Sequence, residues 1–326
     1  MSLRGAGVTA LVLALVAGHV FWGEVAMSPW EVLLAAKGDA SSELHEVVLQ
    51  AVRIPRVLTA AAAGVLLAWL GLLMQTWFRN PLAGPGVLGI TSGGSLGVAL
   101  AVLLGWGMPT WLGASLGCIG VLILIGMGAR RFASPVTTLV FGLMISYAAS
   151  AAVTVLESSA SAESLQTFVF WGMGTFGKAT LWQAATLLGL MVMLGGWMRW
   201  RSGWLDAWLL GEELAQTMGV SQARMNREIL LVTGLALGWV TSVCGPLAFL
   251  GLAVPHVYRF FHAGRSHRDS AFGVAAWGVI LALAADGLVR FTDAGGGAHW
   301  PLNAVLAMLG APVVVSVLWK RTHDWS

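Results

Sequence analysis

Two short patterns in this chain have the spacing of enzyme sites. Gly172-Met173-Gly174-Thr175-Phe176-Gly177 fits the dinucleotide pattern GxGxxG, and Gly93-Gly94-Ser95-Leu96-Gly97 fits the GxSxG pattern of a nucleophilic serine. Both patterns do their chemistry at the end of a strand, where backbone amides or a serine hydroxyl are exposed. Here neither follows a predicted strand, and the second begins an apolar helix. In a chain with 42 glycines we assign no catalytic site to them.

Ionisable residues within the apolar segments are few. Carriers driven by protons or sodium keep carboxylates or histidines at mid-membrane, whereas Asp286 is the only acid inside a predicted span apart from Glu157 and Glu228, which stand at the ends of theirs. Arg290 follows it by four residues, which predicts either a local ion pair or a docking role for Arg290. We expect His19 to be buried with its hydrogen bonds satisfied, and His256, after Pro255, to bond a carbonyl rather than a metal. No HExxH motif or cluster of metal ligands occurs.

The composition predicts a multi-pass membrane protein. Hydrophobic residues make up 57% of the 326 residues, charged residues only 10%, and the mean hydropathy is +0.80. A membrane-spanning helix needs roughly 20 mostly apolar residues. We therefore predict an all-α polytopic fold with about ten transmembrane helices in one domain, 1–326, and the net charge of +3 indicates no nucleic-acid binding. The apolar segments lie near 5–23, 54–78, 87–106, 110–129, 135–157, 180–198, 228–244, 247–261, 271–290 and 302–319.

Basic residues predict the topology. With a cytoplasmic N-terminus, thirteen of the 18 lysines and arginines fall inside, and five fall outside. This is the usual positive-inside bias, and it places both termini and the charged loop 199–228 in the cytoplasm. The stretch 228–261 is interrupted by Gly245-Pro246 and Pro255, so we predict one full helix followed by a short or broken one. The five outer residues are Lys37, Arg53, Arg56, Lys178 and Arg290.

The loop 199–228 carries the densest run of charge in the chain. Between Gly211 and Gly219 it predicts a short helix with Glu212 and Glu213 in the first turn, where the helix dipole favours acids. A loop of this length with its own helix is seldom a simple connection. We interpret it as the contact by which a soluble partner moves the membrane part. Elsewhere, glycines spaced by four, such as Gly93 and Gly97, predict closely packed helices.

Four sequence blocks resemble the permease subunits of bacterial ABC importers for iron chelates, haem and cobalamin, the FecCD-type family. They occur in the family's order between about residues 50 and 315, with Leu309-Gly310-Ala311-Pro312 near the end. The blocks are Arg53-Ile54-Pro55-Arg56-Val57-Leu58, Arg79-Asn80-Pro81-Leu82-Ala83-Gly84-Pro85-Gly86-Val87-Leu88-Gly89, Leu210-Gly211-Glu212-Glu213 with Ala215 and Met218-Gly219-Val220, and Gly245-Pro246-Leu247-Ala248-Phe249-Leu250-Gly251-Leu252 with Val254-Pro255-His256 and Arg259.

The resemblance implies a type II ABC importer permease and assigns roles to three sets of residues. The helix of the charged loop becomes the coupling helix on the ATPase, with small residues clearing its docked face. The outer arginines would pair with acids of a binding protein, and two loops would close the inner end of the path. These sets are Leu210, Gly211, Glu212, Ala215, Met218 and Gly219 for coupling; Arg53, Arg56 and Arg290 for docking; and Asn80, Leu82, Ser134 and Pro135 for the cytoplasmic gate.

The same resemblance implies the partners. These are two cytoplasmic ABC ATPase subunits, a periplasmic substrate-binding protein and a second copy of this chain, in the bacterial inner membrane. The chain itself would be no enzyme and bind no cofactor, because ATP and magnesium belong to the ATPase. The cargo would be a metal chelate, an iron-siderophore or haem, with cobalamin as the alternative; Ser134-Pro135 slightly favours the iron-chelate branch.

Three departures and two other classes of function stay open. Ala248 and Asn303 stand where the family often has glycine, and Phe141-Gly142 replaces a usual Ala-Gly. The last two departures bear on the wall of the transport path and therefore on the identity of the substrate.

A secondary carrier or channel acting alone is the main alternative to an ABC importer permease, and dependence of uptake on ATP would distinguish them. A membrane-embedded enzyme would be revealed by a bound metal or cofactor.

Overall fold

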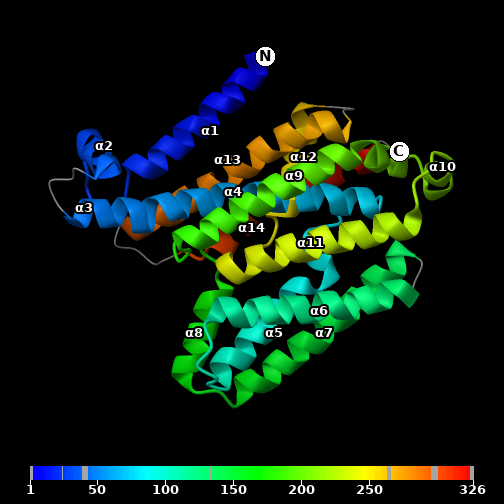
Figure 1. Cartoon of the computed structure of the whole chain (residues 1–326), viewed down its shortest axis with the longest axis horizontal. Helices are drawn as coiled ribbons and strands as arrows, with labels where there is room; N and C mark the ends of the chain where they lie inside the picture. The colour runs from blue at the N-terminus through cyan, green and yellow to red at the C-terminus, as the bar shows by residue number, and fades with distance from the viewer. Residues whose placement is uncertain are drawn as a thin grey trace.

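The computed structural model describes residues 3–23, 25–38, 43–131, 134–262, 266–294 and 300–323, and every regular element within them is a helix. Each predicted apolar segment coincides with one helix (Figure 1). The ten helices are α1 Leu3–Phe21, α4 Ile54–Trp77, α5 Ile90–Leu103, α6 Thr110–Arg131, α7 Pro135–Ser158, α9 Leu181–Leu209, α11 Gln222–Cys244, α12 Leu250–Phe261, α13 His267–Ala294 and α14 Leu302–His323.

Shorter helical elements connect the long helices. Ser28 begins α2 with a capping box, in which its hydroxyl accepts from the Glu31 amide and the Glu31 carboxylate accepts from the Ser28 amide. The segment 24–53 contains two short helices and a π-helical turn that runs directly into α4; Glu24 and residues 39–42 lie outside the described residues. These elements are α2 Pro29–Lys37, α3 Glu43–Val47, η1 Val48–Arg53, η2 Pro85–Leu88, α8 Ala162–Gly172 and α10 Glu212–Thr217.

Not every apolar helix is long enough to cross a membrane. Six helical stretches in the described residues meet the length and hydropathy of a span, whereas α5, with 14 residues, is a shorter apolar helix. The 12 residues of α12 follow the full-length α11. The prediction of one full helix and then a short one over 228–261 is therefore confirmed, with Pro255 inside the short helix.

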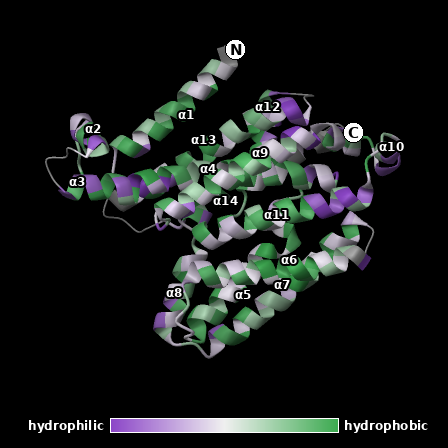
Figure 2. Ribbon diagram, in the orientation of Figure 1, coloured by the Kyte–Doolittle hydropathy of each residue, from purple (hydrophilic) through white to green (hydrophobic). Residues whose placement is uncertain are grey.

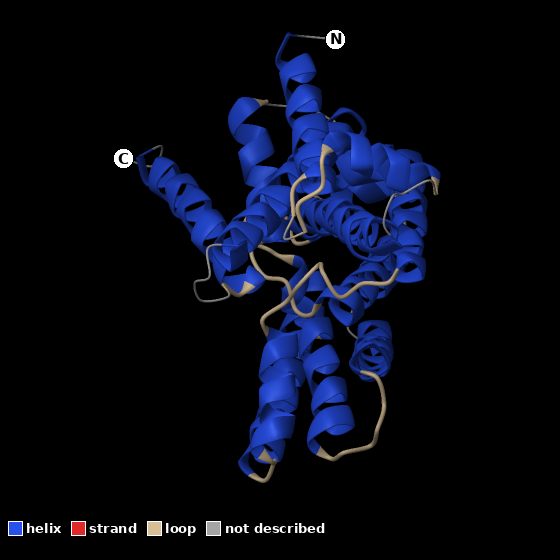
Figure 3. Ribbon diagram, turned by 90° about the vertical axis from the view of Figure 1, so that its left-hand side faces the viewer, coloured by secondary structure: helices blue, strands red, loops and turns tan. Residues whose placement is uncertain are grey.

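The bundle is built around α4. Its apolar stretch is 83% buried, because α13, α9 and α12 pack around it. A second, smaller group, formed by α5, α6, α7 and α8, lies beside this core (Figure 1), and the turned view separates the same two groups (Figure 3). Helix α11 joins the groups through contacts with α6, α5 and α4.

Glycines allow the closest helix crossings. A Cβ atom at Gly97 of α5 would collide with the carbonyl oxygen of Gly113 of α6, and one at Gly93 would lie 2.6 Å from the Gly117 carbonyl oxygen. The packing role predicted for glycines spaced by four residues is thus confirmed for the contact between α5 and α6. The same holds for a pair not predicted: a Cβ at Gly71 of α4 would collide with the Gly251 carbonyl of α12.

The two ends of the molecule differ. Helix α10 and the C-terminus lie at one end, called here the α10 end, and α2 and α3 lie at the other, called the α2 end (Figure 1). Figure 2 shows mostly hydrophobic colour along the long helices and hydrophilic colour around α10 and in α3. Polar ends on an apolar body are what a membrane-embedded bundle requires.

Candidate functional site: a coupling helix, a gate loop and an arginine cluster

The predicted coupling helix is α10, which lies at the α10 end of the molecule and connects α9 with α11 (Figure 1). Gly211 precedes it with φ of 119° and Gly219 follows it with φ of 85°, backbone conformations that side chains with a Cβ rarely adopt. Glu212 and Glu213 lie in its first turn. Glycine is needed at these two positions by the turns that enter and leave the helix, and the predicted helix between two glycines is present.

Three large apolar side chains are exposed at and around α10. Leu210, which caps the end of α9, is 63% exposed, Leu214 within α10 is 51% exposed, and Met218 at the end of α10 is 60% exposed. We call these three residues the apolar ridge. Ala215, by contrast, is fully buried within the chain. Its small side chain therefore lets α10 sit closely on its own subunit, whereas the sequence analysis expected it to clear a face for the partner.

Leu214 is not among the residues predicted for coupling, because the family blocks emphasise glycine, glutamate and alanine in this segment. The repeat of Leu210, Leu214 and Met218 every four residues was the available signal.

Polar contacts connect α10 to the end of α4. The Glu212 carboxylate accepts a hydrogen bond from the Arg79 guanidinium at 3.4 Å. It accepts a second one from the side-chain amide of Gln222 at 3.0 Å. Arg79 is the first residue after Phe78, which caps α4, and it precedes the predicted gate residue Asn80. The predicted coupling helix and the predicted gate loop, residues 79–82, are thus adjacent in space.

Buried tryptophans hold the base of the coupling loop. The Trp208 indole nitrogen donates to the Trp77 carbonyl at 3.1 Å, and the Trp77 indole donates to the Asn226 side chain at 2.8 Å. Trp77 is 1% exposed and Trp208 is fully buried. Because these residues come from α4, α9 and α11, the cluster fixes both ends of the coupling loop to the helix that leads into the gate loop. A further ion pair, Arg201 with Glu228 at 2.6 Å, ties α9 to α11.

The predicted gate residues come from two segments. Asn80 accepts from the Leu82 amide at 2.9 Å, which forms a tight side-chain turn. The His256 ring lies 2.7 Å from the Pro81 carbonyl oxygen, so His256 contacts a carbonyl as predicted and anchors this loop to α12. Ser134 caps the start of α7 and Pro135 is its first residue. Both segments lie at the α10 end (Figure 1).

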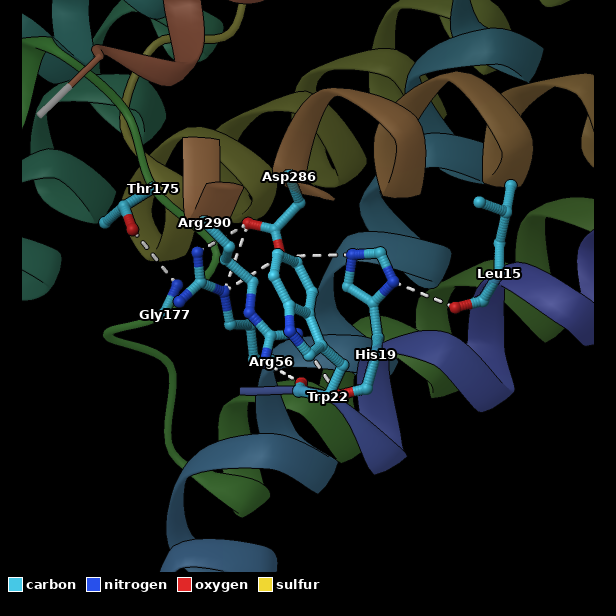
Figure 4. A network of polar contacts seen from close by, with 8 residues as sticks. All are labelled: Leu15, His19, Trp22, Arg56, Thr175, Gly177, Asp286 and Arg290. Carbon is cyan, nitrogen blue, oxygen red and sulfur yellow. Dashed lines mark hydrogen bonds and ion pairs between the residues drawn. The ribbon is translucent and has the colours of Figure 1, made fainter. Parts of the chain in front are cut away.

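At the α2 end, Asp286 is the centre of a buried network (Figure 4). The Arg56 guanidinium donates to both carboxylate oxygens, at 2.9 Å from Nη2 to Oδ1 and from Nε to Oδ2. His19 Nε2 lies 3.5 Å from the carboxylate, and its Nδ1 lies 2.8 Å from the Leu15 carbonyl. Asp286 is 1% exposed. The acid therefore joins α1, α4 and α13, and its bidentate partner is Arg56 rather than the predicted local neighbour Arg290.

The other two predicted docking arginines bind carbonyl groups at the end of α1 and in the segment that follows it. Arg53, which is 3% exposed, donates to the carbonyls of Val20, Phe21 and Val25. Arg290 donates to the carbonyls of His19, at 3.1 Å, and Trp22. The structure thus brings the three arginines to one end from η1, α4 and α13. In this conformation their guanidinium groups face internal partners.

Asn303 is a connecting residue whose role the sequence did not reveal. Its side-chain amide donates to the carbonyls of Gly172 and Pro246, and its side-chain oxygen accepts from the Ala248 amide at 3.0 Å. One side chain at the start of α14 therefore joins the end of α8 to the non-helical link between α11 and α12. A glycine, which the family often has here, could make none of these side-chain contacts.

The enzyme-like patterns find no supporting context in the part of the chain that the structure describes. The GxGxxG pattern follows the helix α8, and its Thr175 amide donates to the Cys244 carbonyl at 2.9 Å. Among the described residues, no group of three or more histidine, cysteine, aspartate or glutamate side chains is arranged to hold a metal ion.

Comparison with known proteins agrees with this geometry. The pattern of the FecCD transport family matches residues 10–320. The vitamin B12 import system permease protein BtuC of Citrobacter koseri is 33% identical over 290 residues, which cover 87% of each chain. The protein of the same name from Salmonella typhi is 33% identical over 292 residues, 88% of each chain.

Two solved structures resemble the fold. An inward-facing ABC transporter assigned to the metal-chelate type matches with a TM-score of 0.83 and 25% identity, over 96% of this chain and 98% of that one. PsaBC from Streptococcus pneumoniae matches with a TM-score of 0.57 and 13% identity, over 87% and 94% of the two chains. The second comparison concerns the fold alone.

Proposed function

This chain belongs to the FecCD transport family and is the permease subunit of a bacterial ABC importer, and from that premise we propose that it imports a metal chelate, an iron-siderophore or haem. The family implies an ATPase and a binding protein as partners, and the permease is not itself catalytic. Family membership removes the solitary carrier and the membrane enzyme from consideration. Cobalamin is the alternative cargo in the same machine, because relatives at 33% identity carry that name.

The observation that carries the coupling role is the apolar ridge. Leu210, Leu214 and Met218 project from a polar tip and are more than half exposed. Exposed apolar groups surrounded by polar ones mark a protein contact. We propose that two ATPase subunits each receive one such ridge, and that their closure on ATP moves α10. The buried Trp77–Trp208–Asn226 cluster then passes the movement to the gate loop at Asn80 and Leu82 and to Ser134–Pro135 opposite.

A second copy of the chain is proposed to pack against α7. Only 11% of the apolar stretch of α7 is buried. Large apolar side chains are exposed along the helix, and α14 adds Met308 at 62% exposure. The family resemblance implies that both helices contribute to the dimer interface and to the wall of the transport path, which supports this proposal. The exposed apolar side chains of α7 include Val136, Val140, Met144 and Tyr147.

The arginine cluster is proposed to receive the periplasmic binding protein. Its members lie at the α2 end, opposite the proposed ATPase contact. We propose the same orientation that the basic residues predict, with the N- and C-termini in the cytoplasm. An arriving carboxylate would add to, or replace, the internal partners of Arg56 and Arg290, while Arg53 is the least accessible of the three. Charge in such a contact sets the rate and register of docking more than its affinity.

Docking is tested by neutralising one arginine. The Arg290→Gln variant should bind the partner binding protein more slowly, with the loss largest at low salt because screening is weakest there. Lys178→Gln, which removes an exposed external charge outside the cluster, is the matched control. Equal binding by the wild type and the Arg290 variant at low salt would count against the docking role.

Cargo and energy source are tested together. The permease, co-purified with its ATPase, is reconstituted in liposomes, and uptake of ferric siderophore, haem and cobalamin is measured with the cognate binding protein, with and without ATP. We expect ATP-dependent uptake of an iron chelate. Uptake of cobalamin but not of the iron chelates would identify cobalamin as the cargo in place of the proposed one. Accumulation without ATP would contradict the coupling mechanism.

A further inference from the structure

A hollow of about 460 Å³ lies near the α10 end, where α4, α9, α12 and α13 meet. We call it the basic hollow. The end of α4 contributes Gln75, Thr76 and Arg79, and Leu209 closes one side from α9. It is distinct from the apolar ridge and from the arginine cluster, although Arg79 also pairs with Glu212 of α10 and Pro81 belongs to the predicted gate loop. The proposed transport mechanism assigns no ligand to it.

The side chains lining the basic hollow are suited to an oxyanion. Four of them are basic, namely Arg79, Arg259, His262 and His267, and none of the lining residues that the structure describes is a carboxylate. The nearest acids, Asp206 and Glu212, lie at the margin of the hollow, and each is paired with a basic residue. His267 Nδ1 lies 2.5 Å from Asp206, and Arg79 pairs with Glu212. The interior of the hollow therefore favours negative charge.

Contacts with neighbouring side chains fix the basic groups that line the hollow. Arg259 donates to the Gln75 side-chain oxygen at 2.6 Å, which holds the guanidinium at the wall of the hollow. The His262 ring stacks on Tyr258 with 4.8 Å between centroids, and its Nδ1 is buried with no hydrogen-bond partner among the described residues. An arginine held in place, beside further N–H and O–H groups, is the arrangement that binds phosphate oxygens.

Exposed aromatic residues place the hollow at the depth of lipid headgroups. Trp200, on α9, is 71% exposed, Phe260 is 69% exposed at the end of α12, and Phe272 is 78% exposed near the start of α13. Tryptophan gathers at the membrane–water interface, which makes Trp200 the marker of depth, while Phe260 and Phe272 offer apolar surface to lipid chains. Basic hollows between helices at that depth bind the headgroups of anionic lipids.

We propose that the basic hollow binds a phosphate ester, supplied by the headgroup of an anionic phospholipid. The phosphate lies against Arg259 and Arg79, and the acyl chains extend along the apolar surfaces of the helices beside the exposed aromatics. Binding there would link α12 and α13 to the end of α4. The proposal depends on neither the ATPase nor the identity of the cargo.

The test compares three probes on the purified full-length chain: phosphatidylglycerol, phosphatidylcholine and inorganic phosphate. Two readouts are used: the rise of the unfolding temperature with probe concentration, and lipid retention in native mass spectrometry. Arg259→Gln removes one basic group from the hollow, and Arg199→Gln removes an equal charge from the exposed surface of α9 outside it. Arg259→Lys keeps the charge, and the unfolding temperature of each variant without probe shows whether it folds.

Phosphatidylglycerol should bind the wild type and the Arg199→Gln variant saturably, and bind Arg259→Gln about fivefold more weakly, the effect expected for one basic residue near a lipid phosphate. Arg259→Lys should recover most of the affinity. If inorganic phosphate gives the same variant dependence and phosphatidylglycerol does not, the anion site stands but its source is a free phosphate. Equal effects of phosphatidylglycerol and phosphatidylcholine with no response to phosphate, or equal losses in the Arg259→Gln and Arg199→Gln variants, would overturn the proposal.

Discussion

Truncating the apolar ridge should detach the ATPase without unfolding the permease. Full burial of a leucine or methionine side chain stabilises a contact by about 1.5–3 kcal/mol. Leu210, Leu214 and Met218 retain 63%, 51% and 60% of their surface. Covering what remains is then worth roughly 1 kcal/mol per residue, and the triple alanine variant should bind the ATPase on the order of a hundredfold more weakly.

The assay is the affinity of immobilised permease for the purified ATPase, with ATP-dependent uptake as a second readout. Leu231→Ala is the matched control for Leu214→Ala, because Leu231 is 47% exposed but lies on the membrane helix α11. Binding by the triple variant within about twofold of the wild type would refute the assignment, since a hundredfold is expected from burial. So would an equal loss in the Leu231 control. Ala215 is not a suitable site for this test, because a larger residue there would displace α10 from its own subunit.

Three other substitutions test the packing and the polar networks. Gly71→Ala should destabilise the permease by about 1–3 kcal/mol through overpacking, seen as a lower unfolding temperature, whereas Gly120→Ala, with open space around its Cβ position, should not; equal behaviour would contradict the close crossing. Asp286→Asn should cost about 3–5 kcal/mol by leaving a buried charge on Arg56, and adding Arg56→Gln should restore part of the loss; additive losses would argue against a coupled pair. Asn303→Ala should cost about 1–3 kcal/mol by leaving buried polar groups unpaired, and an unchanged unfolding temperature would contradict its bridging role.

Much of the fold could be predicted because its signals are local in the sequence. Apolar runs of about 20 residues located the long helices, and glycine with proline located the interruption before α12. The glycines around α10 were equally informative, since backbone turns with positive φ leave a trace in residue type. Family blocks then gave the order of the functional segments.

The contacts between distant segments could not be predicted. Asp286 lies four residues before Arg290, and local spacing suggested that pair, but Arg56 is 230 positions away in sequence and approaches because α4 and α13 pack together. Likewise, Ala215 looked like a docking residue until its burial showed which side of α10 faces the subunit. The glycines predict that turns flank this six-residue helix, but they do not predict which of its sides packs on the subunit, because that depends on contacts with α9 and α11.

The shortness of α12 has a consequence for where water reaches in this protein. Its 12 residues rise only about 18 Å, well below the roughly 30 Å thickness of the hydrocarbon layer. Non-helical backbone at that depth is tolerated only against protein or a solvated lumen, and Ala248 in the link before α12 is exposed. An aqueous vestibule should therefore extend deep into the bilayer at this point, so that a thiol introduced by Ala248→Cys is labelled by charged thiosulfonate reagents. The native thiols of Cys118 and Cys244, both buried, stay unlabelled.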